Sequence, residues 1–180
     1  RDAQESRGLG DVYKRQPGEE NISGKYIMIR NGCTFEELDV ALMMHGGPAT
    51  QTDIKCLANA AWQLTYHGKA AHAALKPEAG RSSLDAMCLA FHGMECLREH
   101  VTDDVRLHYN ITDAGGTAAN VVPSLTRAQV MVRANTVKAV KELMVRLEKI
   151  FQGAAMMTET EAEIRLDKVL DNKIPNLRLN

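Results

Sequence analysis

The order in which two hydrophobic periods alternate after residue 60 limits the fold more than any other feature of this sequence. Apolar and polar side chains alternate in four segments, as in strands with one buried face: Trp62–His67, Val105–Thr112, Arg127–Ala134 and Glu161–Asp167. A stretch with helical spacing follows the first segment, and another follows the third. The predicted order is therefore strand, helix, strand, strand, helix, strand.

The two helical stretches each carry an apolar stripe. The first opens with Ser82 and Asp85 at the spacing of a capping box and is expected to end near His100. The apolar residues of the second are Val140, Leu143, Met144, Leu147 and Phe151. We predict an α+β domain with ferredoxin-like βαββαβ topology over residues 60–170, in which two helices cover one face of an antiparallel sheet.

The first helix has more small and apolar residues than one sheet face requires. A second set stands at helical spacing beside the first: Ala86, Leu89, Ala90, Gly93 and Leu97. These residues indicate either a face that needs a partner or a wide stripe within the domain's own core. Both interpretations stay open at this point.

Residues 17–59 show another pattern. Ser23 precedes a short helical stretch that ends near Gly32, and the apolar run Leu38–Met44 is typical of a strand buried on both faces. We interpret 17–59 as part of an α/β domain to which 171–180 returns. The first residue is Arg1 rather than methionine, so we expect a longer protein. Residues 1–16 are polar and aperiodic, and we predict that they are a non-native leader.

Charge and hydropathy exclude two classes of partner. Lys and Arg total 22 against 23 Asp and Glu, so no net field attracts nucleic acid. The polar face of the predicted sheet also lacks the aromatic residues that stack on bases. Apolar runs fall far short of the roughly 18 residues that a membrane span needs. We predict no nucleic-acid or membrane partner and, without a secretion signal, a cytoplasmic location.

Acidic residues and a histidine form the first candidate site. Glu19 and Glu20 are adjacent in the sequence Pro-Gly-Glu-Glu, and His45 ends the apolar run before two glycines. One carboxylate can hold a cation while its neighbour accepts a proton from water, and open α/β sheets place ligand groups at the ends of strands. The alternative is structural, since glutamates ahead of a helix complement its positive end.

Two motifs adjoin the predicted sheet. His72 lies in the sequence His-Gly-Lys-Ala-Ala-His-Ala-Ala after the first strand. The link between the second and third strands contains Gly115, Gly116 and Asn120, and Arg133 lies in the strand that follows. Hairpin links usually have about two to five residues, so a longer one is often functional. Otherwise the glycines only turn the chain and Asn120 caps a loop.

Together these three motifs, in this order, resemble those of the co-catalytic zinc amidohydrolases. That family includes aminoacylase, glutamate carboxypeptidase, the auxin-conjugate hydrolases and, most similar here, the aminobenzoyl-glutamate hydrolases. The resemblance covers residues 17–180. It implies a ferredoxin-like lid and dimerisation domain next to part of an α/β catalytic domain that binds two zinc ions, with manganese as an alternative.

The resemblance also assigns roles at the metal site. It implies that Glu19 is the general base, that Glu20 is a zinc ligand and that His45 is a ligand of the second zinc. The family's other metal ligands have no counterpart in this chain. A catalytic zinc needs about three protein ligands, so the site is incomplete here and we expect the chain alone to be inactive.

The remaining roles fall on the lid. The resemblance implies that His72 polarises the scissile carbonyl, usually across a homodimer, and that Asn120 and Arg133 hold a substrate carboxylate. The expected substrate is a small amide: an N-acyl or aminobenzoyl amino acid, or a dipeptide. The alternative function is that of a non-catalytic ferredoxin-like module for dimerisation or for binding a small molecule.

Overall fold

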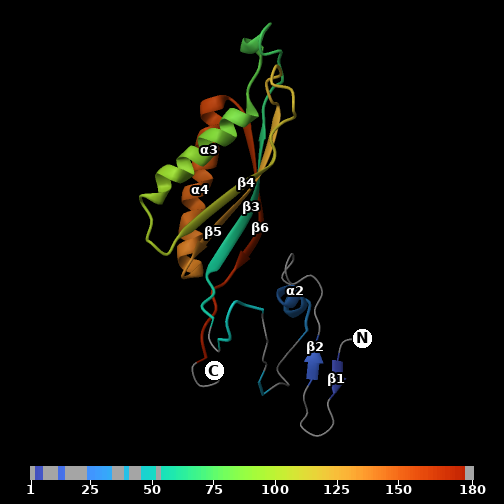
Figure 1. Cartoon of the computed structure of the whole chain (residues 1–180), viewed down its shortest axis with the longest axis vertical. Coiled ribbons are helices and arrows are strands. Elements are labelled where there is room, and N and C mark those ends of the chain that lie inside the picture. Colours follow the sequence, from blue (N-terminus) through green and yellow to red (C-terminus); the bar gives the residue numbers. More distant parts are fainter. Residues whose placement is uncertain are drawn as a thin grey trace. The chain divides into compact units, whose positions relative to one another are not determined.

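A computed structural model describes residues 3–5, 12–14, 24–33, 39–40, 46–51 and 54–176 of the chain (Figure 1). The chain divides into two compact units, residues 1–50 and 51–180. None of the helices in the described segments combines the length and hydrophobicity that a membrane crossing needs. The two units are described separately below.

The described part of the first unit contains three short elements. Strands β1 (Ala3–Glu5) and β2 (Val12–Lys14) pair antiparallel, and helix α2 (Gly24–Arg30) follows. The sequence predicted this helix and its end: Gly32 has φ +86°, a conformation that glycine adopts without steric cost. The predicted strand Leu38–Met44 lies outside the described residues except for Asp39 and Val40.

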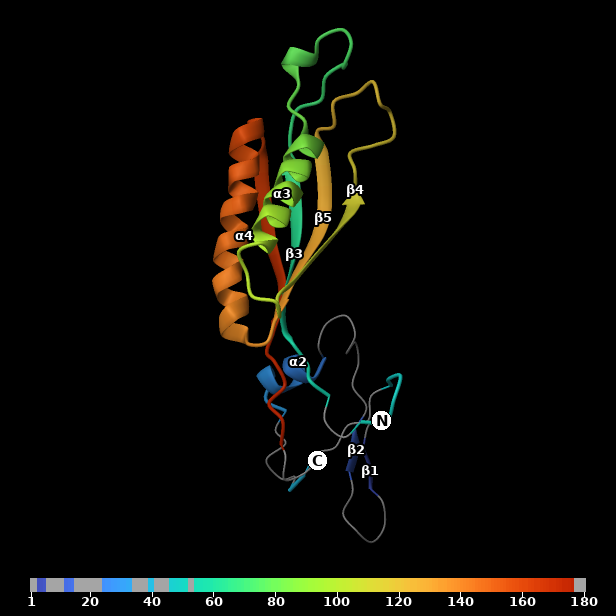
Figure 2. The ribbon, with the colours of Figure 1, turned by 60° about the vertical axis from the view of Figure 1, so that its left-hand side comes forward.

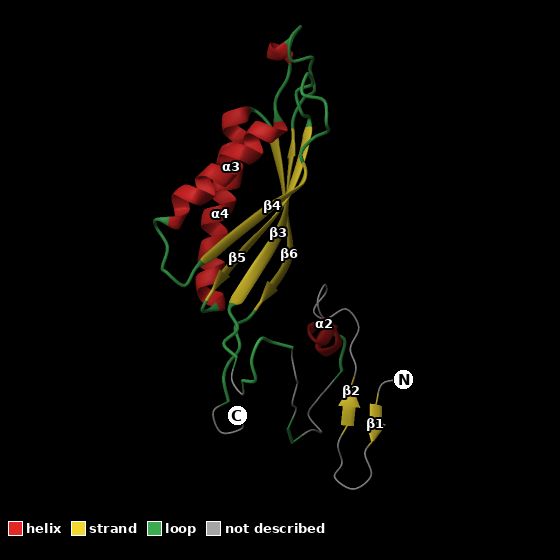
Figure 3. Cartoon of the chain, in the orientation of Figure 1, coloured by secondary structure: helices red, strands yellow, loops and turns green. Residues whose placement is uncertain are grey.

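The second unit has the predicted order of elements. The order is β3 (Ala58–His67), α3 (Ser83–Arg98), β4 (Arg106–Asp113), β5 (Leu125–Ala134), α4 (Val137–Thr158) and β6 (Glu161–Leu170), with a short 3₁₀ helix, η1 (Pro77–Ala79), before α3. The strands form one antiparallel sheet in the order β4-β5-β3-β6 (Figure 3). The α+β fold with βαββαβ topology is confirmed.

Both long helices lie on one face of this sheet, and the core lies between them and the strands (Figure 2). Tyr66 on β3 is fully buried there, and its hydroxyl donates to the Phe151 carbonyl of α4 across 2.8 Å. Burial raises the pKa of Tyr66, so the hydroxyl stays protonated and remains a donor. The bond ties the end of β3 to α4.

Strand β3 begins earlier than the alternation predicts. Ala58, Ala60 and Ala61 are buried; all three pair with β5, and Ala60 and Ala61 also pair with β6. Small alanines give no contrast that reveals a strand. The register with β6 shifts between Ala61 and Trp62, which marks an irregularity where the clear alternation starts. Hydrogen-bonded pairing with the neighbouring strands therefore extends β3 into a segment where the hydropathy pattern does not predict a strand.

Most of the second apolar stripe of α3 lies in the domain's own core. Ala86, Ala90 and Leu97 are buried, and Gly93 lies against Ile150 of α4. Leu89 of the same stripe remains 36% exposed. Most of the stripe therefore fits the interpretation as a wide stripe within the core, and Leu89 is the member left for a partner. The stripe is wide because α3 packs against the sheet and α4 at once, which the helical period alone does not reveal.

The apolar side of α3 that remains partly exposed lies toward β4. The Phe91 and Tyr109 rings stack with centroids 3.9 Å apart, and the Tyr109 hydroxyl donates to Glu95 Oε1 across 2.8 Å. Strand β4 is an edge of the sheet, and its Tyr109 and Ile111 side chains remain 37% and 39% exposed. This edge has no covering element in the described part of the chain.

Candidate functional site

The predicted site residues divide into two groups. Glu19, Glu20 and His45 lie outside the described residues, so their roles stay predictions. Within the described segments, no cluster of three or more His, Cys, Asp or Glu side chains could hold a metal ion. His72, Asn120 and Arg133 lie in the second unit and can be placed.

Two loops beyond the end of the sheet carry His72 and Asn120. These loops, residues 68–82 and 114–124, are called the distal loop pair below (top of Figure 1). The first loop folds back on itself, because Lys69 and Arg81 exchange backbone hydrogen bonds of 2.8 and 2.9 Å.

The same loop pairs with the second loop at His72. The Ala73 N–H donates to the Asn120 carbonyl, and the Val122 N–H donates to the Ala71 carbonyl, each across 2.9 Å. These bonds form an antiparallel bridge between His72 and Val121. His72 therefore lies where the first loop pairs with the second, and Asn120 is adjacent to its partner Val121.

Glycines allow this close packing. A Cβ on Gly68 would lie 2.1 Å from the Arg81 carbonyl oxygen, and one on Gly80 would lie 3.0 Å from Ala71 Cβ. Side chains at these two positions would push the segments apart. The short sequence Pro-Glu-Ala-Gly-Arg thus closes the loop because it has a glycine at the point of contact.

Buried polar groups hold the base of the distal loop pair. Ser83 donates to the Pro123 carbonyl through its N–H, 2.9 Å away, and through its hydroxyl, 3.0 Å away. The same hydroxyl lies 2.9 Å from Thr126 Oγ1, and both side chains are fully buried. Sequence reasoning found only the neighbouring cap, in which Ser82 Oγ accepts from the Asp85 N–H, and missed this pair.

The His72 ring has one nitrogen engaged and one available. Its Nδ1 accepts the Ala74 N–H across 3.3 Å, and the side chain is exposed. A neutral ring whose Nδ1 accepts carries its proton on Nε2. His72 Nε2 has no partner in the described part of the chain, so the ring can donate a hydrogen bond to an outside oxygen.

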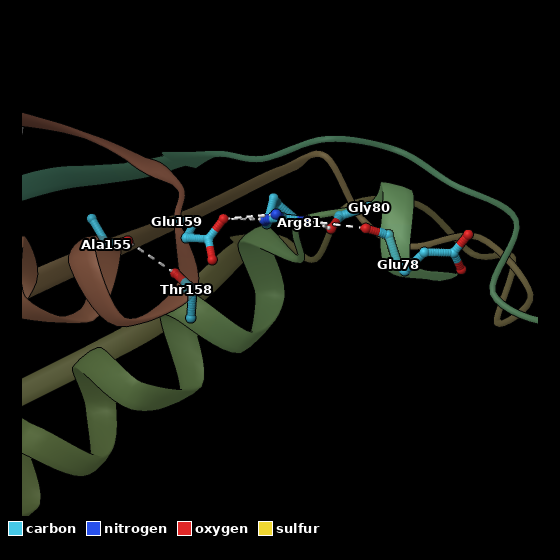
Figure 4. Close-up of polar contacts among 6 residues, drawn as sticks. All are labelled: Glu78, Gly80, Arg81, Ala155, Thr158 and Glu159. Atoms are coloured by element: carbon cyan, nitrogen blue, oxygen red, sulfur yellow. Dashed lines mark hydrogen bonds and ion pairs between the residues drawn. The ribbon is translucent and has the colours of Figure 1, made fainter. Parts of the chain in front are cut away.

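An ion pair joins the first distal loop to the end of α4 (Figure 4). Arg81 Nε and Nη2 both lie 2.7 Å from Glu159 Oε2. Arg81 Nη1 donates to the carbonyls of Gly80 and Glu78 across 2.7 and 3.2 Å. No local pattern identifies Glu159, because its partner stands 78 residues away in the sequence.

Arg133 lies at the other end of the sheet, called the proximal end below. Strand β5 starts next to the distal loop pair at Leu125, and Arg133 stands opposite Asn59 and Arg106. Arg133 is eight positions after Leu125 along the strand, a distance of about 26 Å. One copy of the chain therefore brings His72 and Asn120 together but keeps Arg133 apart from both.

Two arginines at the proximal end lack acidic partners among the described residues. Arg106 and Arg133 are directly opposed across β4 and β5, an arrangement that repels. Arg133 donates only to the Met131 sulfur, and Arg106 to the carbonyls of Asp103 and Val105; neither has an acidic partner among the described residues. This end of the open face therefore suits an anionic group.

Comparisons with known proteins agree with this architecture. Residues 58–156 match the family model described as the peptidase dimerisation domain of the M20 family. The chain is 41% identical to a p-aminobenzoyl-glutamate hydrolase polypeptide of Escherichia coli over 91% of its own length and 34% of that protein. It is 33% identical to the Xaa-Arg dipeptidase of Mus musculus, over 91% of this chain and 38% of the relative.

A solved structure gives the same result. The aminobenzoyl-glutamate utilization protein from Klebsiella pneumoniae superposes with a TM-score of 0.59 at 28% identity, covering 67% of this chain and 30% of the other. The chain thus spans about a third of the length of the proteins it matches. With the family model matched over more than half of its residues, the chain belongs to the M20 peptidase family and carries that family's dimerisation domain.

Proposed function

We propose that the chain is part of a longer metal-dependent amidohydrolase, called the parent enzyme below. The proposed reaction is hydrolysis of the amide bond in an N-acyl or aminobenzoyl amino acid or a dipeptide. The names of the relatives support this substrate class, since one is a p-aminobenzoyl-glutamate hydrolase and another an Xaa-Arg dipeptidase. The observation that carries the proposal is the exposed His72 ring, with Nδ1 engaged and Nε2 available.

The proposed roles in the dimerisation domain follow from chemistry. His72 Nε2 donates a hydrogen bond to the amide oxygen, on which negative charge develops in the transition state. Arg133 forms charge-assisted hydrogen bonds with the substrate carboxylate, and Asn120 adds an amide donor. These three side chains therefore fix the two ends of the reacting amino acid.

Two copies can bring these groups together where one copy cannot. A twofold axis through the β4 edge sets the two β4 strands antiparallel. The distal loop pair of one protomer then lies toward the proximal end of its partner. On this basis His72 and Asn120 of one protomer serve the same substrate as Arg133 of the other.

The metal roles rest on the motif around Glu19, Glu20 and His45. Carboxylates and imidazoles are donors that zinc accepts, although two ligands fall short of a catalytic site. Glu20 and His45 would hold the metal, and Glu19 would accept a proton. When bound, the zinc ions supply a Lewis acid and a water of lowered pKa.

An assay of the parent enzyme tests this function. The parent enzyme should hydrolyse p-aminobenzoyl-glutamate or an N-acetyl amino acid, lose turnover with a chelator and regain it with added zinc. The 180-residue chain alone should show no turnover. A metal-loaded parent enzyme that hydrolyses none of these amides would contradict the proposal and favour a non-catalytic dimerisation module.

A further inference from the structure

The Arg81–Glu159 ion pair links the loop that bears His72 to the helical layer of the domain. Arg81 closes the base of the first distal loop, and Glu159 is the first residue after α4. Two guanidinium nitrogens lie 2.7 Å from one carboxylate oxygen, so the bonds are charge-assisted (Figure 4).

Short contacts connect Arg81 to the segment that contains His72. Its Nη1 holds the carbonyls of Gly80 and Glu78, so the turn around η1 is fixed to the end of α4. Its backbone pairs with Lys69, three residues before His72. Gly80 also packs so closely on Ala71, the residue before His72, that a Cβ there would lie 3.0 Å from Ala71 Cβ.

Glu159 occupies a position where helix stability alone favours glycine. Its backbone is left-handed, with φ 53° and ψ 39°. The Thr160 N–H bonds to the Ala155 carbonyl and the Glu159 N–H to that of Met156, which is the Schellman end of a helix. A side chain other than that of glycine costs stability there. What glutamate adds at this position is a carboxylate that contacts Arg81.

The ion pair contributes little to folding itself. The Arg81 and Glu159 side chains are 39% and 71% exposed, and exposed pairs have small effects on the free energy of unfolding. A change in the pair should therefore move the loop more than it weakens the domain.

We propose that the Arg81–Glu159 pair positions His72 for catalysis, so that both are positioning residues of the reaction. The inference rests on the proposed function, because it needs His72 to act on the substrate. His72 needs such support because its loop lies beyond the end of the sheet, where the core does not hold it. Displacement of the ring would weaken its hydrogen bond in the transition state more than the binding of the ground-state substrate.

Two substitutions in the parent enzyme separate position from stability. Glu159→Gly removes the carboxylate and relieves the left-handed backbone, so the melting temperature should stay or rise. The same variant should lower kcat by about 10- to 100-fold with KM little changed. Glu159→Gln, which keeps the size of the side chain, should lower kcat in the same direction. Asp167→Asn, which breaks the exposed Arg165–Asp167 pair of 3.1 Å on β6, is the matched control and should change neither.

A double-mutant cycle with His72→Ala decides whether the effect passes through His72. In the His72→Ala background, Glu159→Gly should lower kcat no further. An equal loss in both backgrounds, or an unchanged kcat for Glu159→Gly in the presence of His72, would overturn the positioning role and leave the proposed function standing. If His72→Ala alone retains full kcat, the proposed function of His72 fails and the inference fails with it.

Discussion

At the scale of single residues, Arg133 has no acidic partner among the described residues. Its guanidinium meets only the Met131 sulfur among the described residues, and Arg106 opposes it across the sheet. Because charge repulsion between opposed side chains destabilises a sheet, a ligand carboxylate would relieve an unfavourable arrangement. This placement favours a binding role over a structural one.

Arg133→Ala in the parent enzyme should therefore weaken the binding of substrates that have a free carboxylate. KM should rise by about 10- to 100-fold for such a substrate, because a charge-assisted hydrogen bond is lost. It should rise much less for the corresponding carboxamide. Steady-state kinetics on the two substrates measures the difference. Gln129→Ala, on the same face of β5, is the control. Equal losses on both substrates would show that Arg133 only supports the fold.

Glu95 gives the domain a pH-dependent contact at the β4 edge. The Arg98 guanidinium, with Nε 2.6 Å from Glu95 Oε2, and the Tyr109 hydroxyl hold the pKa of Glu95 below its ordinary value. The unfolded carboxyl thus takes up its proton at a higher pH than the folded one. Its stabilisation is complete above the ordinary glutamate pKa and is lost as pH falls through the lowered folded value.

Glu95→Gln should reveal this dependence in the chain itself. Near neutral pH the variant should be less stable than the wild type by under about 1 kcal/mol, since the pair is exposed. The difference should vanish once the pH falls below the lowered pKa of Glu95. Urea unfolding at several pH values measures it, with Glu148→Gln as the control. A difference that persists unchanged in strong acid would refute the assignment to the carboxylate.

At the scale of elements, the close contact of α3 with α4 depends on a glycine at position 93. A Cβ on Gly93 would lie 2.6 Å from Ile150 Cγ2, whereas a Cβ on Gly153 of α4 has no neighbour within 4 Å. Both glycines lie within helices, where alanine is intrinsically preferred. The two positions therefore separate packing from helix propensity.

The sign of the effect should differ between them. Gly93→Ala should destabilise the domain by about 1–3 kcal/mol through overpacking. Gly153→Ala should stabilise it by about 0.5–1 kcal/mol. Removing the obstructing methyl with Ile150→Ala should make Gly93→Ala neutral or stabilising in that background. Urea unfolding of the four variants tests this; a stabilising Gly93→Ala in the wild-type background would refute close packing at this crossing.

Local patterns predicted the elements better than their contacts. Alternation and helical spacing predicted the order of strands and helices, because each element has one clear buried face. They could not extend β3 through its alanines or decide which neighbour covers α3. Loop length singled out the link that contains Asn120. The distance from Asn120 to Arg133 and the pairing of Arg81 with Glu159 depend on long-range geometry that no local pattern encodes.

At the scale of the whole molecule, the two sheet edges differ in their capacity to pair. The outer edge of β6 is blunted by charged side chains, which discourage pairing: Glu161, Glu163, Arg165, Asp167 and Lys168. Strand β4 instead presents Tyr109 and Ile111 beside the apolar side of α3. A stable interface buries on the order of 800 Å² per partner, which an edge strand and a helix can supply. We expect the homodimer to form through β4.

Ile111→Glu should therefore separate the protomers. The charge would be buried against its own copy across the twofold axis, where like charges repel and lose their hydration. Light scattering should give the mass of a monomer for this variant and of a dimer for the wild type. Val145→Glu, at an exposed apolar position on α4, should leave the mass of the dimer unchanged. A dimer that survives Ile111→Glu would place the interface elsewhere.

The proposed dimer makes each active site depend on both protomers, which a mixing experiment can detect. A Glu19→Gln parent enzyme should be nearly inactive, and so should a His72→Ala parent enzyme. In a mixed dimer, the protomer that retains Glu19 receives His72 from its partner, so one of the two sites is complete. Random exchange of equal amounts should restore about a quarter of the wild-type sites, since half of the dimers are mixed. If His72 acted within its own protomer, no site in the mixture would be complete. Mixed dimers that form, as shown by two affinity tags, but stay inactive would therefore exclude the contribution of His72 across the interface.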